Sequence, residues 1–256
     1  MSSSSPTGSD LPARATASTF ARSLLVQGSW NYRTMLGSGF AYALLPVLRR
    51  LYGSEPEALR EPVERHMEHF NAHPYLSSLA LGAVVRLESE GADPQVVRKL
   101  KTAMGGPLGS LGDALVWATI LPGIALGALA LLWLGVPVWL AVGVFLVAYN
   151  VMHLGMRAWG FRAGRRTGRE VGRLLARADL SGWTHRAQPV VVVLLGLFVG
   201  AVIGGGRGLV EAGMLWLILA VAGFLAGLLG GHRAWRPAAA LTVVAIGILS
   251  LAGTVS

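Results

Sequence analysis

Residues 68–75 read E-H-F-N-A-H-P-Y and form the densest group of hydrogen-bonding side chains in a largely apolar chain. Pro74 has no backbone N–H and disfavours helical geometry at His73, so a helix is predicted to end near Asn71 or Ala72. The mostly apolar residues that follow, 76–85, are about half of the ~20 residues that a helix needs to cross a bilayer. We therefore expect this segment to dip into a membrane or to pack inside the protein.

Backbone groups freed by such a break are tolerated at membrane depth only where protein buries them or where they line a wet cavity, as substrate sites of transporters do. A broken helix rich in Asn, His and Glu is therefore a candidate solute-binding element beside a membrane surface.

The composition indicates a membrane protein. The 256 residues are 53% hydrophobic and 14% charged, with a mean hydropathy of +0.55, whereas soluble domains carry about 25% charged residues. The chain has no cysteine, which excludes disulfides and thiolate catalysis. We predict an all-α integral membrane protein, with re-entrant or interfacial helices in the N-terminal half and transmembrane helices in the C-terminal half.

The chain divides into three parts by composition. Residues 1–18 lack a long apolar run and are predicted to be a disordered cytosolic tail. Residues 19–113 are predicted to be a cytoplasmic and interfacial region with re-entrant segments. Residues 114–256 are predicted to form the membrane region, whose candidate membrane segments are 115–134, 136–156, 190–206, 214–231 and 238–255.

Several local sequence signals predict where helices begin and which charged stretches contact solvent. Asp93 and Pro94 suit the N-cap and first turn of a helix, and Pro62 is expected near the start of another. The charged stretches 52–73 and 88–101 are expected in solvent. Residues 105–112 are predicted to be a flexible glycine-rich loop, with Asp113 either capping the next helix or taking part in proton or ion coupling, and Pro122 is expected to kink that helix.

Residues 157–187 carry eight arginines against two acids, which predicts a cytoplasmic loop by the positive-inside rule. Because a hairpin returns to its starting side, the N-terminus is also expected in the cytoplasm, and three later crossings would leave the C-terminus outside. The arginines, especially Arg165, Arg169 and Arg173, could dock an acidic cytosolic partner or anionic lipid headgroups, or serve topology alone.

Glycines recur at every fourth position of the same segment. On a helix they would leave a groove that another helix can approach closely. We predict that this helix packs against another subunit or against its own hairpin. The glycines are Gly160, Gly164, Gly168 and Gly172.

Four blocks of sequence resemble the IID subunit of the mannose/fructose/sorbose-type sugar phosphotransferase system. Residues 65–75, R-H-M-E-H-F-N-A-H-P-Y, are similar to its R-H-x-E-F-F-N-T-H-P-Y. Residues 27–32 are similar to Q-x-S-W-N-Y, residues 39–42 with Pro46 to G-F-x-Y-x-x-x-P, and residues 104–113 to M-G-P-L-A-G-I-G-D. The chain departs from the family pattern at His69, Ala72 and Leu121, and residues 104–113 contain one additional Gly.

The resemblance implies a non-catalytic subunit of the bacterial cytoplasmic membrane that works in a hetero-oligomer. With a IIC subunit it would translocate a hexose, which the cytosolic IIB protein phosphorylates with phosphate relayed from IIA. Glu68, Asn71 and His73 would bind the sugar or shape its path, or else cap and brace the re-entrant segment. IIB would dock on the arginines, and lipids would contact the membrane region.

Other kinds of site are not expected. His66, His69 and His73 do not match a zinc-binding motif, and no Walker motif is present. We expect no metal, no cofactor, no catalytic residue and no nucleic-acid partner. The alternative function is a degenerate IID-like protein that regulates or scaffolds without transporting; a stand-alone secondary transporter is disfavoured because few membrane segments carry acids.

Overall fold

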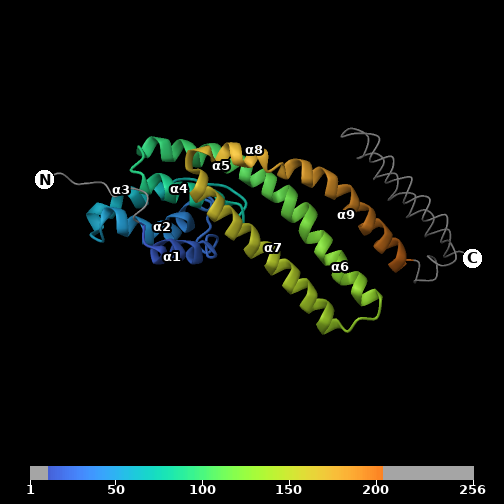
Figure 1. The fold of residues 1–256 in the computed structure, drawn as a ribbon. Coiled ribbons are helices and arrows are strands. Elements are labelled where there is room, and N and C mark those ends of the chain that lie inside the picture. The colour runs from blue at the N-terminus through green and yellow to red at the C-terminus, as the bar shows by residue number, and fades with distance from the viewer. Residues whose placement is uncertain (1–10, 204–256) are drawn as a thin grey trace, which may run out of the picture. The chain divides into compact units, whose positions relative to one another are not determined.

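The computed structural model describes residues 11–203, which are almost entirely helical and contain no strand beyond two isolated bridges. The predicted all-α class is therefore confirmed for this part of the chain (Figure 1). The helices are α1 (Ala13–Ser23), α2 (Gly37–Tyr52), α3 (Pro56–Met67), α4 (Ser77–Ser89), α5 (Pro94–Gly112), the π-helix η1 (Asp113–Ile120), α6 (Leu121–Trp133), α7 (Val138–Thr167), the 3₁₀ turn η2 (Gly168–Glu170), α8 (Val171–Arg177) and α9 (Leu180–Ile203).

The described chain forms two units. The first contains the residues up to 114 together with 149–180, and the second contains residues 115–148 and, from 181 onward, the described part of α9. The candidate segments 214–231 and 238–255 lie outside the described residues.

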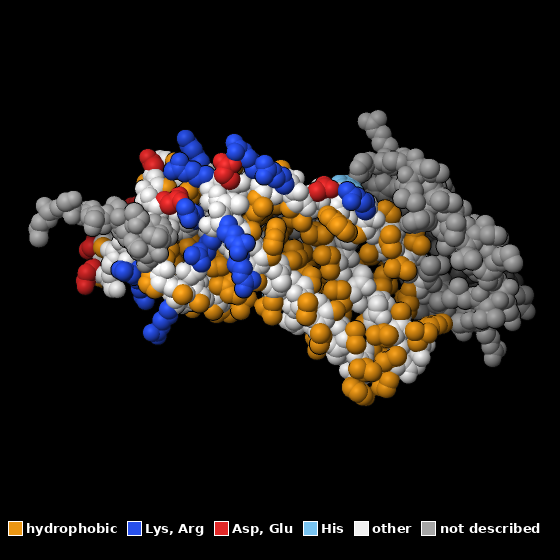
Figure 2. All heavy atoms as spheres, viewed as in Figure 1, with side chains coloured by type: hydrophobic (Ala, Val, Ile, Leu, Met, Phe, Trp, Pro, Cys, Tyr) orange, Lys and Arg blue, Asp and Glu red, His pale blue; other side chains and the backbone are white. Residues whose placement is uncertain are grey.

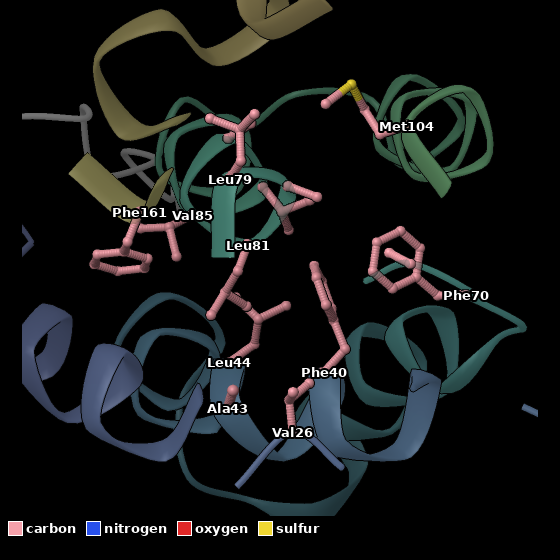
Figure 3. Close-up of a cluster of buried hydrophobic side chains, with 14 of the residues drawn as sticks. Val26, Phe40, Ala43, Leu44, Phe70, Leu79, Leu81, Val85, Met104 and Phe161 are labelled. Carbon is pink, nitrogen blue, oxygen red and sulfur yellow. The ribbon is translucent and has the colours of Figure 1, made fainter. Parts of the chain in front are cut away.

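The core of the first unit is built around α4. Every residue of α4 except Arg86 is buried, as expected for a helix that is apolar on all sides. Phe40 of α2 packs edge-on against Phe70, with ring centroids 4.9 Å apart, and Leu79 and Phe161 complete the cluster from α4 and α7 (Figure 3). Of the two outcomes expected for residues 76–85, the structure shows packing inside the protein.

Glycine allows α4 and α7 to approach closely. A Cβ at Gly164 would overlap the carbonyl oxygen of Leu79, and one at Gly160 would lie 2.6 Å from Oγ of Ser78. The predicted groove therefore exists at these two positions, but its partner is α4 rather than another subunit or the hairpin. Gly168 instead adopts a φ of +52° where α7 ends, and no described atom lies within 4 Å of a Cβ at Gly172.

The predicted glycine-rich loop at 105–112 is wrong, because these residues are the last turns of α5. Their glycines serve close packing: a Cβ at Gly105 would lie 2.9 Å from the carbonyl oxygen of Asn71, and one at Gly112 would overlap His73. Asp113 is the C-cap of α5 and not the N-cap of a separate helix. It begins η1, which continues α5 without interruption.

Other boundaries also differ from prediction. Residues 13–18, expected in the disordered tail, belong to α1. Pro62 lies inside α3, whose first turn holds Pro56 instead. Asp93 does cap α5, accepting a hydrogen bond from the backbone N–H of Gln95 at 2.6 Å. The arginine-rich stretch 157–187 is mostly helical, in α7, η2, α8 and the start of α9.

The second unit exposes apolar surface. Orange side chains cover α6 and the N-terminal part of α7 in Figure 2, where Val138, Trp139 and Val147 are each more than 60% exposed. Two helical stretches, Pro94–Trp133 and Val138–Gly196, are long and apolar enough to cross a membrane. The helix changes from π to α geometry at Leu121, next to Pro122, since proline cannot supply the N–H that a continued ladder needs.

Candidate functional site

The segment between α3 and α4 is the break that the sequence predicted, although α3 already ends at Met67. Its backbone is held from two sides. Phe70 donates its N–H to the carbonyl oxygen of Thr34 at 3.2 Å and accepts from the N–H of Leu36 at 2.9 Å, while the N–H of His73 donates to the carbonyl oxygen of Leu108 at 3.4 Å. These contacts replace the hydrogen bonds that a helix would have supplied.

The three predicted site residues do not face one space. Glu68 is exposed and forms an ion pair with Arg98 of α5 at 2.7 Å, and Asn71 is exposed. His73 is 1% exposed, and its ring stands perpendicular to that of Tyr75 with centroids 4.9 Å apart. Burial, followed by the charge of Arg157, lowers the pKa of His73 to about 4, so this imidazole is neutral at physiological pH.

His73 and Tyr75 instead adjoin a partly buried polar cluster from α7. The hydroxyls of Tyr75 and Tyr149 share a hydrogen bond, and His153 lies against the Tyr75 ring, with centroids 4.3 Å apart. Arg157, which is 2% exposed, donates to Nε2 of His153 at 2.9 Å and lies 5.2 Å from the centroid of the Tyr75 ring.

Sequence reasoning missed the α7 members of this cluster. A signal was present, because Tyr149, His153 and Arg157 recur at four-residue spacing within a strongly apolar stretch and so occupy one face of a helix. Ionisable residues in such stretches are usually turned toward protein partners. Arg157 also donates to the carbonyl oxygen of Ser23 at 2.6 Å, which ties α7 to the end of α1.

A second buried polar cluster joins α3, α4 and α5 to the end of α2. Arg65 donates to both carboxylate oxygens of Glu88, at 2.9 and 3.1 Å, His66 lies 2.9 Å from the same carboxylate, and the Tyr52 hydroxyl donates to it at 2.6 Å. Lys101 donates to the carbonyl oxygens of Arg65 and His66 at 3.2 and 3.1 Å, where the last carbonyls of α3 need donors. The prediction that these charges are solvated was wrong.

The pKa values in this cluster follow from burial and from Glu88. Burial alone would raise the pKa of Glu88, but the hydrogen bonds from His66 and Tyr52 and the charge of Arg65 outweigh it and lower the pKa to about 2. Burial and the bond to Glu88 raise the pKa of Tyr52 to about 12. Burial also lowers the pKa of His66, so the carboxylate is ionised beside a neutral imidazole.

Arg165, Arg169 and Arg173, which were predicted to dock a partner, do not lie together. Gly168 divides Arg165 from the other two. Arg165 lines a cavity of about 470 Å³ together with Arg86, Arg162 and Arg166. Arg169, in η2, is exposed, and Arg173, in α8, forms an ion pair with Glu170. Among residues 11–203, no group of three His, Asp or Glu side chains is arranged to hold a metal ion.

The chain matches one family of proteins over most of its length. The family model described as PTS system mannose/fructose/sorbose family IID component covers residues 10–205. The mannose-specific EIID component of Escherichia coli K12 is 31% identical over 185 residues, covering 70% of this chain and 63% of the relative. The fructose permease IID component of Bacillus subtilis 168 is 32% identical over 196 residues, covering 71% of this chain and 65% of the relative.

The chain therefore spans less than two thirds of the length of these two curated relatives. Solved structures show the same fold. A chain described as a membrane protein superposes with a TM-score of 0.65 at 30% identity, covering 76% of this chain and 71% of that one. A chain in a cryo-EM structure of the mannose transporter ManYZ with microcin E492 superposes with a TM-score of 0.58 at 29% identity, covering 75% and 71%.

Proposed function

Because this chain belongs to the IID components of the mannose/fructose/sorbose phosphotransferase family, we propose that it works with a IIC subunit to translocate a hexose across the cytoplasmic membrane. The sugar is phosphorylated during transport by IIB, which receives its phosphate from IIA. The observation that carries the proposal is the family match over residues 10–205, which contains every described helix. The comparisons give no support to the regulatory or scaffolding alternative.

The partner in the membrane is a IIC subunit, together with lipid. Contiguous apolar surface of this extent is rare on soluble proteins, and α6 and α7 expose large side chains such as Trp133, Trp139 and Val147. We assign this surface to contacts with IIC and with acyl chains.

The break between α3 and α4 shapes the sugar path in this proposal. Asn71 is exposed, so its amide is available to donate to and accept from a hydroxyl-rich solute or IIC. His73 is buried and acts as a positioning residue, because it packs under Gly112 of α5 and against Tyr75. Glu68 pairs with Arg98 and holds the start of the segment to α5.

The cytosolic partner IIB docks on the arginines beyond the Gly168 turn. Arg169 and Arg173 are exposed and can meet an acidic surface, which would speed association through long-range attraction. This assignment places 157–187 and the N-terminus on the cytoplasmic side, in agreement with the positive-inside rule, and the C-terminus outside by the sequence-based count of crossings.

The test is uptake by reconstituted vesicles. The chain is inserted with and without a IIC subunit, IIA, IIB and phosphoenolpyruvate are supplied on the cytoplasmic side, and mannose, fructose and sorbose are offered in turn, since these sugars give the relatives their names. We expect accumulation of a phosphorylated sugar only when both membrane subunits and phosphoenolpyruvate are present. Uptake by this chain alone would refute the proposal.

A further inference from the structure

Four arginine side chains from two helices line one cavity of about 470 Å³: Arg86 comes from α4, and Arg162, Arg165 and Arg166 come from the last turns of α7. No acidic side chain lines the cavity within the described chain. Its volume falls in the range of about 300–1,000 Å³ that small-molecule sites occupy.

The cavity is built into the packing of α4 against α7. A Cβ at Gly82 would overlap the carbonyl oxygen of Phe161 and lie 2.9 Å from the backbone nitrogen of Arg165. Gly168, with a φ of +52°, places its backbone against Arg86, so that a Cβ there would lie 3.1 Å from Cγ of Arg86. A side chain at Gly82 would force the two helices apart. The arginines therefore meet because glycines bring their backbones together.

The positive charge in the cavity is largely uncompensated. Arg86 pairs with Glu90, but in residues 11–203 no carboxylate lies within 4.0 Å of Arg162, Arg165 or Arg166. Four arginines of the first unit differ from these three, since those at 60, 65, 98 and 173 each have a glutamate partner. Because arginine keeps its proton at any physiological pH, these side chains present positive charge that a bound anion can meet.

We propose that the cavity lined by Arg86, Arg162, Arg165 and Arg166 binds a phosphate group, carried by a soluble phosphate monoester or by an anionic lipid headgroup. Planar guanidinium groups donate paired hydrogen bonds that match phosphate oxygens. Several guanidinium groups around one open cavity suit a compact anion with several oxygens better than the single carboxylates on a protein surface. The proposal does not depend on sugar transport.

The test uses the purified full-length chain and the double variant Arg162→Gln/Arg166→Gln. Both side chains are exposed, so their replacement leaves the core unchanged, and an unaltered thermal unfolding midpoint without ligand verifies this. The matched control is Arg169→Gln/Arg173→Gln, which removes the same charge from outside the cavity. Calorimetry follows inorganic phosphate and glucose 6-phosphate, with glucose as the uncharged probe. Native mass spectrometry counts phosphatidylglycerol and phosphatidylcholine retained from mixed nanodiscs.

We expect either glucose 6-phosphate or phosphatidylglycerol, the two phosphate carriers, to bind the unmodified chain and the control variant. Affinity in the cavity variant should fall on the order of a hundredfold, because each lost charge-assisted contact costs about tenfold. Saturable binding of glucose 6-phosphate identifies a soluble ligand, and selective retention of phosphatidylglycerol identifies a lipid. The proposal is overturned if neither carrier binds or if the two variants lose binding equally.

Discussion

Glu88 is the carboxylate on which the cluster between α3, α4 and α5 depends, since Arg65, His66 and the Tyr52 hydroxyl all converge on it. Its side chain is 1% exposed, and that of Arg65 is 2% exposed. Removing the charge leaves a guanidinium buried without its main partner, a change that typically costs about 3–5 kcal/mol.

We therefore expect Glu88→Gln to lower the free energy of unfolding by about 3–5 kcal/mol, measured by thermal unfolding of the purified chain in detergent. The control is Glu64→Gln, which breaks an ion pair with Arg60 whose side chains are 66% and 70% exposed. Exposed pairs contribute about 0–1 kcal/mol. Equal shifts in the two variants would show that the buried network contributes no more than a surface pair.

His73 makes stability depend on pH. Its pKa is about 4 in the folded chain against an ordinary value of 6.5, so between these values the unfolded state binds a proton that the folded state does not. Stability is therefore full above about pH 6.5 and falls as the pH drops toward 4. His73→Gln should flatten this part of the stability profile, and His69→Gln, at an exposed position, should leave it unchanged.

The slope that remains in His73→Gln is expected from His66, whose pKa burial also lowers. A stability profile with the same slope in the unmodified chain and in His73→Gln would contradict the assignment.

At the scale of elements, the contact between α4 and α7 requires glycine at particular positions only. A methyl group at Gly164 meets the backbone of Leu79, which cannot move aside without displacing α4. Gly164→Ala should therefore destabilise the chain by about 1–3 kcal/mol. Gly172→Ala should instead stabilise it by up to about 1 kcal/mol, because alanine favours a helix and no described atom stands in its way. Thermal unfolding of the two variants checks both signs, and a loss of stability of similar size in both would contradict this account.

Local rules predicted the elements that depend on local chemistry. Pro74 correctly indicated a break before α4, and Asp93 and Pro94 correctly indicated the start of α5. The glycines at 105–112 were misinterpreted because the same residue type supplies flexibility in a loop and close approach in a packed helix. Only the neighbours that α5 meets, Asn71 and His73, distinguish the two cases.

The buried clusters were harder to predict for a related reason. A charged residue on an amphipathic stretch is usually solvated, and nothing in the order of residues shows that Arg65, Glu88 and Lys101, far apart in the chain, meet in one interior. The α7 residues that surround Tyr75 could have been found from their four-residue spacing within an apolar stretch. The sequence could not show that Glu68, Asn71 and His73 face different surroundings, because the side chains of an irregular segment follow no fixed period.

At the scale of the whole molecule, the family match and the structural likeness to chains of a mannose transporter and of another membrane protein confirm the predicted class of helical membrane protein. The proposed orientation can be tested directly because the chain has no cysteine. Arg169→Cys should react with a membrane-impermeant thiol reagent from the cytoplasmic side alone. Leu134→Cys, at the exposed turn between α6 and α7, should react only from the opposite side if this pair of helices spans the membrane.

Paired measurements on inside-out and right-side-out vesicles give both results in one experiment. Labelling of the two positions from the same side would show that the α6–α7 pair enters the membrane without crossing it. Labelling of position 169 from outside would reverse the orientation and exclude the arginines as a docking surface for IIB.

The enclosure of α4 has a consequence for biosynthesis. The helix leaves the ribosome early, yet part of its cover, α7 around Gly164, is made roughly 80 residues later, which at about 5–20 residues per second is a delay of roughly 4–16 s. During that interval α4, which is apolar but too short to anchor itself in lipid, is not yet covered by α7. The burial of α4 is therefore completed only after α7 has been synthesised, so the timing of α7 synthesis limits how soon the finished fold can appear.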